Sequence, residues 1–232
     1  MSERGPIAVG VLLAAGAGRR MGSPKGLLRH PDGTPWVARA LDVLIDGGCD
    51  RAVLVVGAAG DDVTALARRA HHRDRVDVVE APDWADGMGA SLRAGLAAAA
   101  GLPPGAPHLA GRSGTRTATR GAGIGPGLVE GTGTDGAPGI ALVHLVDLPD
   151  VGADCVARVL AAASDETALA RAWFAGRPGH PVALGRRHWG EARSAARGDR
   201  GARDFLSAAD VLAVDCTDLA GGGDVDLPSP PG

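Results

Sequence analysis

Aromatic side chains are scarce in this chain of 232 residues: they make up 3% of it, and tyrosine is absent. Proteins that bind single-stranded nucleic acid stack the bases on such rings, so platforms of this kind are few here. The formal net charge of −3 also provides no basic face of the sort that a general nucleic-acid-binding protein needs. We therefore expect no nucleic-acid partner.

Cysteine and long apolar runs are rare as well. Cys49, Cys155 and Cys216 form an odd, widely spaced set without a C-x-x-C pair, which indicates neither a disulfide framework nor a zinc site. No run approaches the ~20 apolar residues of a membrane span, so no membrane partner is expected. Arg4 and the apolar residues 7–15 loosely resemble a signal peptide, but its cleavage site would fall in a loop rich in cations. A reducing, cytoplasmic location fits these features better.

What the chain does contain is an ordinary hydrophobic content of 45%, built mainly from Ala, Val and Leu. Short apolar runs predict buried strands at residues 7–13, 51–56, 76–80, 140–146, 169–174 and 211–216. Helical spacing of apolar residues predicts helices at residues 35–48, 61–72, 153–163 and 186–196, and further helices after residues 87 and 198. Because strand and helix alternate, we expect an α/β fold with a mostly parallel sheet and helices on both faces.

Residues 101–139 interrupt this alternation. They contain 12 glycines and 5 prolines but almost no large apolar side chains, so they cannot build a core. A loop of this length without periodicity is usually disordered or a specialised lid. We interpret it as a disordered insertion in a single domain over residues 1–232, which ends in a flexible tail at residues 217–232.

The first apolar run breaks into a loop that combines glycines with cations. Gly16, Gly18 and Gly22 allow sharp turns and bring backbone N–H groups close to an anion. Arg20 and Lys25 supply the opposite charge. The loop therefore predicts a phosphate-binding site.

Lys25 is the only lysine among 24 lysines and arginines, which either reflects chance or a need for a compact ammonium group. Two common glycine motifs do not match. Met21 stands where a dinucleotide-binding fingerprint needs its third glycine, and Gly26 follows Lys25 where a P-loop needs Ser or Thr.

Two later stretches also suit a ligand. Asp147 follows the apolar run at 140–146, and open α/β sheets bind ligands at the carboxyl ends of their strands; the alternative is a loop acid without a role. Gly87 and Ser91 open an alanine-rich helix whose N-terminus can hold an anion, although Ser91 taken alone is better explained as a helix-start residue. We expect Asp150 to cap the helix that follows it.

The loop at residues 13–25 reads L-A-A-G-A-G-R-R-M-G-S-P-K and resembles the L-A-A-G-x-G-x-R-M-G-x-P-K signature of the MobA-like NTP transferases. That family contains the molybdenum cofactor cytidylyl- and guanylyltransferases. Four further blocks resemble it in order, at residues 81–95, 147–151, 177–181 and 198–203. Ala81 stands where the family often has asparagine, and in the tail Leu227 replaces a threonine.

This resemblance implies a Rossmann-like nucleotide-diphospho-sugar transferase fold and transfer of a nucleoside monophosphate to a phosphorylated acceptor, with Mg²⁺ and release of pyrophosphate. CTP is the favoured donor and GTP the alternative. The acceptor implied is molybdopterin, and a molybdoenzyme client is a further partner. A sugar phosphate, phospholactate or a non-catalytic nucleotide-binding role are the alternatives, the last because the tail departs from the family.

The resemblance also assigns residues to roles. The catalytic residues implied are Arg20, Lys25 and Asp147. Those that bind the nucleotide are Leu13, Ala14, Ala15, Gly16, Gly18, Arg20, Lys25, Gly87 and Ser91. Asp147 and Asp226 would hold the metal. His180 and Asp199 would contact the acceptor, although His180 equally suits a hydrogen bond within its loop and Asp199 a helix cap.

Overall fold

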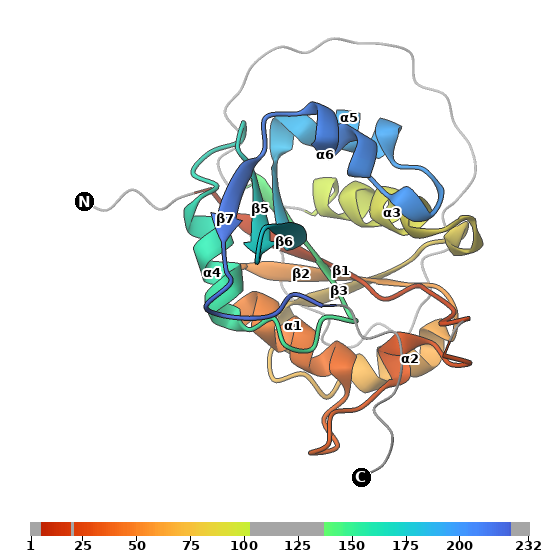
Figure 1. The fold of residues 1–232 in the computed structure, drawn as a ribbon. Coiled ribbons are helices and arrows are strands. Elements are labelled where there is room, and N and C mark those ends of the chain that lie inside the picture. The colour runs from red at the N-terminus through yellow and green to blue at the C-terminus, as the bar shows by residue number, and fades with distance from the viewer. Residues whose placement is uncertain (1–5, 20, 103–136, 224–232) are drawn as a thin grey trace.

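The computed structural model describes residues 6–19, 21–102 and 137–223, which form one layered α/β structure (Figure 1). Its seven strands lie in the order β3-β2-β1-β4-β6-β5-β7. The strands are β1 (Ala8–Leu13), β2 (Arg51–Val56), β3 (Val76–Glu80), β4 (Ile140–Leu145), β5 (Leu169–Phe174), β6 (Arg177–Gly185) and β7 (Leu212–Asp215). All neighbouring pairs are parallel except the two that involve β6. The expected mostly parallel sheet is confirmed.

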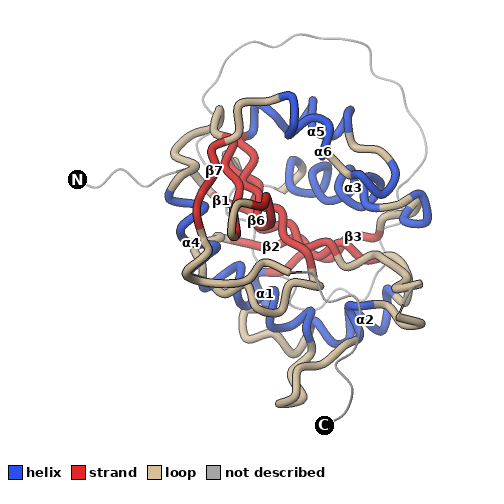
Figure 2. Tube along the Cα trace, in the orientation of Figure 1, coloured by secondary structure: helices blue, strands red, loops and turns tan. Residues whose placement is uncertain are grey.

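Helices cover both faces of this sheet (Figure 2). One face carries α1 (Trp36–Asp46), α2 (Gly60–Ala67) and α4 (Ala153–Ala161), and the other α3 (Met88–Ala100), α5 (Trp189–Ala195) and α6 (Arg203–Ala208). Short 3₁₀ helices are η1 (Lys25–Leu27), η2 (Arg73–Arg75), η3 (Trp84–Asp86), η4 (Arg186–His188) and η5 (Gly198–Arg200). Among the described residues no helix has the length and apolar character to cross a membrane.

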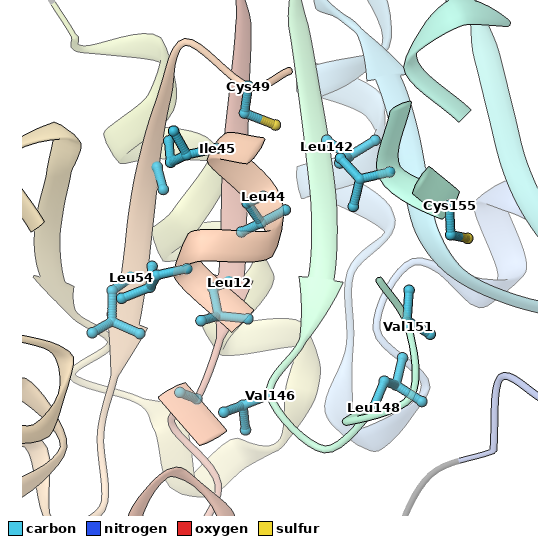
Figure 3. Close-up of a cluster of buried hydrophobic side chains, with 14 of the residues drawn as sticks. Leu12, Leu44, Ile45, Cys49, Leu54, Leu142, Val146, Leu148, Val151 and Cys155 are labelled. Carbon is cyan, nitrogen blue, oxygen red and sulfur yellow. The ribbon is translucent and has the colours of Figure 1, made fainter. Parts of the chain in front are cut away.

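The central strands are buried on both faces, which explains why their sequences are almost continuously apolar. Leu12 packs beneath α1 against Leu44 and Leu142 in the larger cluster, part of which Figure 3 shows. The next residue, Leu13, faces the α3 side instead, because successive side chains of a strand point to opposite faces. Each such buried leucine contributes roughly 1.5–3 kcal/mol to the free energy of folding.

Register aligns the strand ends at one edge. Leu13 pairs with Val55 of β2 and with Leu145 of β4, so three central strands reach their carboxyl ends together. The loops that follow β1 and β4 therefore start side by side. These are the loops that carry the glycines and Asp147.

The structure differs from the expected elements in two details. Residues 177–181, for which no strand was expected, begin β6. The pairing of β6 with β4 covers Val182 to Gly185, so Pro181 lies just outside that pairing and its missing N–H costs no bond there. Asp150 does not cap α4, which starts after Gly152 without a side-chain cap.

Candidate active site

The loop after β1 begins as a continuation of the sheet and then opens. Ala14 N–H donates to the Val55 carbonyl at 2.9 Å, and the Ala15 carbonyl accepts from Ala58 N–H at 3.0 Å, while Leu13, Ala14 and Ala15 are all buried. Gly16, by contrast, is exposed. Within the described residues the N–H groups of Gly16, Ala17 and Gly18 have no protein acceptor. Three consecutive free N–H groups are what a phosphate cradle offers.

Gly18 is needed for the shape of this loop. Its φ is +60°, and a Cβ there would lie 1.8 Å from the Ser23 carbonyl oxygen, where the chain folds back. Gly16 differs, because a Cβ there would meet nothing within 4 Å. The open space beside Gly16 is thus available to a ligand. Arg20 lies outside the described residues, so its assignment stays a prediction.

Lys25 and Asp147 form an ion pair between the two loops. The Lys25 Nζ is 2.8 Å from the Asp147 Oδ2, and the two side chains are 18% and 19% exposed. The predicted phosphate-binding cation and the predicted metal ligand therefore meet at the carboxyl edge of the sheet.

A cavity of about 290 Å³ opens next to this pair. It lies on the face covered by α3 and α6, and its lining brings together Leu13, Asp147 and the two residues predicted to contact the acceptor, His180 and Asp199. Two arginines that sequence reasoning did not assign to the site, Arg171 and Arg203, also line it.

The predicted start of α3 contacts the site through Gly87. Gly87 has a φ of +102°, and a Cβ on it would lie 2.5 Å from the Asp199 Oδ1, so α3 begins tightly against η5. Ser91 is buried in the first turn of α3, with 5% of its surface exposed. Of the described residues in this helix, Met88 and Leu92 line the cavity and Ser91 does not. A role for Ser91 toward the nucleotide stays a prediction.

His180 is partly exposed to the cavity but is uncharged at neutral pH. Burial lowers its pKa to about 3, and the positive charges of Arg171 and Arg203 act in the same direction. A neutral imidazole provides one donor and one acceptor nitrogen. His180 can therefore hydrogen-bond a ligand in the cavity without adding charge.

The acidic groups suit a metal that needs few protein ligands. Among the described residues no group of three or more His, Cys, Asp or Glu side chains could hold a metal ion. Mg²⁺ is commonly bound by one or two carboxylates, together with water and phosphate oxygens, so Asp147 at the edge of the cavity fits that ion. Asp226 lies outside the described residues. The described chain shortly before Asp226 is tied to the loop that carries Asp147, because the N–H groups of Gly221 and Gly222 donate to the Asp150 Oδ2 at 2.9 and 3.0 Å.

Arg171 and Arg203 could have been found from the sequence, though only by weak signals. Arg171 is a charged residue within an otherwise apolar strand, between the buried residues Ala170 and Ala172. Arg203 closes the block at residues 198–203 that resembles the family. Neither signal shows that the two guanidinium groups share one cavity, since that depends on how β5 and α6 pack.

The mostly parallel sheet, with an N–H-rich loop after its first strand and an acid after its fourth, has the nucleotide-diphospho-sugar transferase fold. Residues 10–213 match the MobA-like NTP transferase domain, and the chain belongs to that family.

Known proteins resemble the chain over nearly its whole length. Nicotine blue oxidoreductase from Paenarthrobacter nicotinovorans is 32% identical over 230 residues, which are 95% of this chain and 93% of that protein. The crystal structure of Rv0371c from Mycobacterium tuberculosis H37Rv is similar with a TM-score of 0.64 and 25% identity, covering 97% of this chain and 95% of that one. A structure of Rv0371c in complex with manganese has a TM-score of 0.58 and 24% identity, covering 90% of this chain and 88% of that one. The structure of a nucleotidyl transferase from Methanothermobacter thermautotroptrophicus has a TM-score of 0.62 and 18% identity, covering 90% of this chain and 87% of that one.

Proposed function

We propose that the protein transfers a nucleoside monophosphate from an NTP, with CTP favoured over GTP, to a phosphorylated acceptor, and that the acceptor is molybdopterin. An acceptor phosphate oxygen forms a bond to the α-phosphorus of the NTP. The bond from that phosphorus to the bridging oxygen breaks, and pyrophosphate leaves. No strong base is required, because the acceptor phosphate is already an anion.

The observation that carries this proposal is the Lys25–Asp147 pair between the N–H-rich loop and the cavity. The loop is suited to the triphosphate, and the cavity has room for a second substrate. Bringing two anions together is the main obstacle, and one cation about 4 Å from the α-phosphate offsets roughly 4 kcal/mol at an effective dielectric constant of 20. We assign to Lys25 the role of supplying such a charge as pyrophosphate departs.

Mg²⁺ is the metal we propose for this site. Asp147 would hold it, with Asp226 as the second ligand. When bound, it would neutralise phosphate charge and polarise the reacting phosphoryl group. The manganese complex of Rv0371c supports a divalent-metal site in a protein of the same fold.

A second candidate function comes from the relative at 32% identity, which is nicotine blue oxidoreductase. An oxidoreductase activity is therefore a specific alternative to nucleotidyl transfer. A sugar phosphate or phospholactate as the acceptor, and a non-catalytic nucleotide-binding role, are further alternatives. A molybdoenzyme that receives the finished cofactor would be the protein partner in the favoured case.

The decisive assay follows pyrophosphate release with Mg²⁺, each of the four NTPs, and purified molybdopterin, a sugar phosphate or phospholactate. We expect pyrophosphate only with molybdopterin, fastest with CTP. Release with another acceptor keeps the reaction and changes the substrate. If no acceptor supports pyrophosphate release while the protein changes the absorbance of nicotine blue in the presence of an added reductant, an oxidoreductase activity replaces nucleotidyl transfer as the proposed function.

A further inference from the structure

The chain after β7 turns back toward the site. β7 ends at Asp215, at the same edge of the sheet as the end of β4, because β4, β5 and β7 all run in one direction. From there the chain runs past α4 and turns toward the middle of the sheet (Figure 1). We call residues 216–223 the C-terminal segment.

The first half of the C-terminal segment is fixed to the body of the protein. Cys216 is buried, and its N–H donates to the Trp173 carbonyl at 2.9 Å. Leu219 packs against the larger hydrophobic cluster. Arg158 of α4 donates to the Asp218 Oδ2 at 2.9 Å. These contacts hold the segment beside α4 and the end of β5.

The second half carries no side chains, because it passes directly over an aromatic ring. Gly222 has a φ of +64°, and a Cβ on it would lie 2.1 Å from the Phe174 Cδ2 at the end of β5. At Gly223 φ is not positive, and a Cβ would meet nothing within 4 Å. Of these two neighbouring glycines, only Gly222 occupies a place where a side chain has no room.

Asp150 anchors this second half. Its Oδ2 accepts from the Gly221 N–H at 2.9 Å and from the Gly222 N–H at 3.0 Å. Hydrogen bonds to an ionised carboxylate are roughly twice as strong as those between neutral groups. Because Asp150 follows Asp147 by three residues, these bonds tie the C-terminal segment to the loop that carries the proposed metal ligand. Asp150 therefore has a partner in the segment and not in α4, which it does not cap.

The anchor fixes where the chain lies beside the cavity. Gly222 and Asp147 both line the cavity of about 290 Å³. Asp226, the proposed second metal ligand, follows Gly222 by four residues, which can span at most about 14 Å. With Gly222 held at the cavity, Asp226 stays within range of Asp147. Release of the segment would spread Asp226 over a larger volume and lower its effective concentration at the site.

We propose that Asp150 is a positioning residue: by holding Gly221 and Gly222, it keeps the C-terminal segment at the cavity and thereby strengthens the binding of a divalent metal at Asp147. The effect is carried by the backbone of the segment and needs no contact between Asp150 and the metal. This inference rests on the proposed function for the metal and for Asp226 as its ligand. The docking of the segment itself stands on the contacts of the described residues.

The first experiment measures the docking by amide hydrogen exchange in the full-length protein. We expect exchange at residues 221 and 222 to be at least roughly tenfold faster in Asp150→Ala, because both N–H groups lose a charged acceptor. Asp150→Asn keeps an acceptor oxygen and should retain most of the protection. Unchanged exchange in Asp150→Ala would overturn the docking role of Asp150.

Gly222→Ala releases the segment in a second way, without changing any charge. The added methyl group has no room beside Phe174 and disfavours the positive φ, so exchange should again be faster. Gly223→Ala is the matched control, because it adds the same methyl group one residue further on, where there is space. Circular dichroism and the melting temperature establish that each variant is folded.

The second experiment measures metal binding with Mn²⁺ alone, titrated into the full-length protein while the free ion is followed by electron paramagnetic resonance. We expect the Kd to rise roughly tenfold in Asp150→Ala and Gly222→Ala, since the loss of hydrogen bonds to a charged group costs a factor of that order. Asp150→Asn and Gly223→Ala should stay within about threefold of the parent. An equal loss of affinity in Asp150→Asn and Asp150→Ala would show that the charge of Asp150 matters and not the docking, and would overturn the inference.

A double variant tests whether the segment acts through Asp226. Gly222→Ala combined with Asp226→Asn should bind Mn²⁺ like Asp226→Asn alone, because a released segment then has no ligand left to withhold. Residues that act on the same interaction do not have additive effects. A further tenfold loss in the double variant would contradict this route.

The third experiment separates the inference from the proposed function. With an acceptor that supports pyrophosphate release, Gly222→Ala should raise the Mg²⁺ concentration for half-maximal rate about tenfold and leave kcat at saturating Mg²⁺ within about threefold. Unchanged metal dependence in a variant whose segment exchanges faster overturns the inference while nucleotidyl transfer stands. Weaker Mn²⁺ binding in Asp150→Ala and Gly222→Ala, without pyrophosphate release from any acceptor, supports the inference and counts against the reaction. A parent protein that binds no Mn²⁺ would overturn the inference together with the proposed metal site.

Discussion

At the scale of single residues, Lys25 and Asp147 have charged atoms 2.8 Å apart although 122 positions separate them in the chain. The local sequence around either residue does not predict that the two side chains meet. The parallel register of β1 and β4 brings them together, since it aligns the strand ends. The ion pair holds both side chains between the loops that follow β1 and β4, where a phosphate could replace Asp147 as the partner of Lys25 and a metal could replace Lys25 as the partner of Asp147.

Replacing Lys25 tests the role of this cation in the chemistry. We expect Lys25→Ala to lower turnover by roughly 10²- to 10³-fold, as the loss of one preorganised electrostatic contact does in other enzymes. Lys25→Arg should also be impaired, because a planar guanidinium does not replace a compact ammonium group. Arg19→Ala removes an exposed cation from the same loop and serves as the control. Near-normal turnover in Lys25→Ala would refute the assignment.

His144 is the residue whose burial has the clearest consequence for stability. It lies in β4 with no exposed surface, and neither ring nitrogen has a partner among the described residues. Burial lowers its pKa from 6.5 to about 4. The unfolded chain therefore takes up a proton at this residue below pH 6.5, whereas the folded protein does so only near pH 4. As the pH falls through this window, the folded state loses stability.

The expected size of that loss is about 2 kcal/mol between pH 7.5 and pH 5. His144→Leu, which fills a similar volume, should remove this part of the pH dependence. Urea unfolding of parent and variant at pH 7.5, 6 and 5 measures it. The variant should become more stable relative to the parent as the pH falls, and a difference that does not vary with pH would contradict the burial argument.

At the scale of elements, local apolar patterns were enough to predict most of the sheet. The expected strands at residues 51–56, 76–80 and 169–174 coincide with β2, β3 and β5. β2 is almost continuously apolar because both of its faces are buried, whereas β3 at the edge of the sheet carries Asp77 and Glu80 and is recognised by its valines. Helix ends were less predictable. The helix expected to reach residue 72 is α2, which ends at Ala67; the chain then turns before η2 begins at Arg73.

The strand β6 was the main element that the sequence concealed. Its first half, R-P-G-H-P, is made of residues typical of turns, and only its pairing with β4 and β5 gives it an extended form. The same pairing explains why the sequence did not assign Arg171 to the site. The position of one arginine in a strand does not show which cavity it lines, because the cavity is formed only when β6 and α6 pack beside β5.

The interpretation of residues 101–139 as an insertion that adds nothing to the core can be tested by replacing most of it. The structure describes its two ends, where Leu102 packs on the α3 side of the core and Gly139 N–H donates to the Ile7 carbonyl. Residues 103–136 lie outside the described part, so the insertion stays a prediction from composition. Replacing residues 104–135 by a short Gly-Ser linker should change the melting temperature by only a few degrees, because doubling a loop costs about 0.6 kcal/mol.

Limited proteolysis is the companion measurement. Cleavage of the parent should occur first between residues 103 and 136, and the nicked protein should stay folded. A large loss of stability on replacement would show that the segment packs against the core, and that glycine and proline content alone misled the interpretation.

At the scale of the whole molecule, the fold places three parts of the chain around one edge of the sheet. The glycine loop follows β1, Asp147 follows β4, and the start of α3 meets η5 beside the cavity. The sequence predicted these parts singly, and the structure brings Lys25, Asp147, His180 and Asp199 to one location. It leaves Arg20 and Asp226 as predictions, because both lie outside the described residues.

The measurement that tests the account most directly is the initial rate of pyrophosphate release as a function of Mg²⁺ concentration, for the parent, Asp147→Asn and Asp226→Asn. Asp147→Asn keeps the shape of the side chain and removes its charge, so we expect a folded protein whose metal-dependent turnover falls by several powers of ten. Asp226→Asn should show a weaker loss if the tail supplies the second ligand. An Asp147→Asn curve that overlies the parent's would contradict the placement of the metal and triphosphate at this edge.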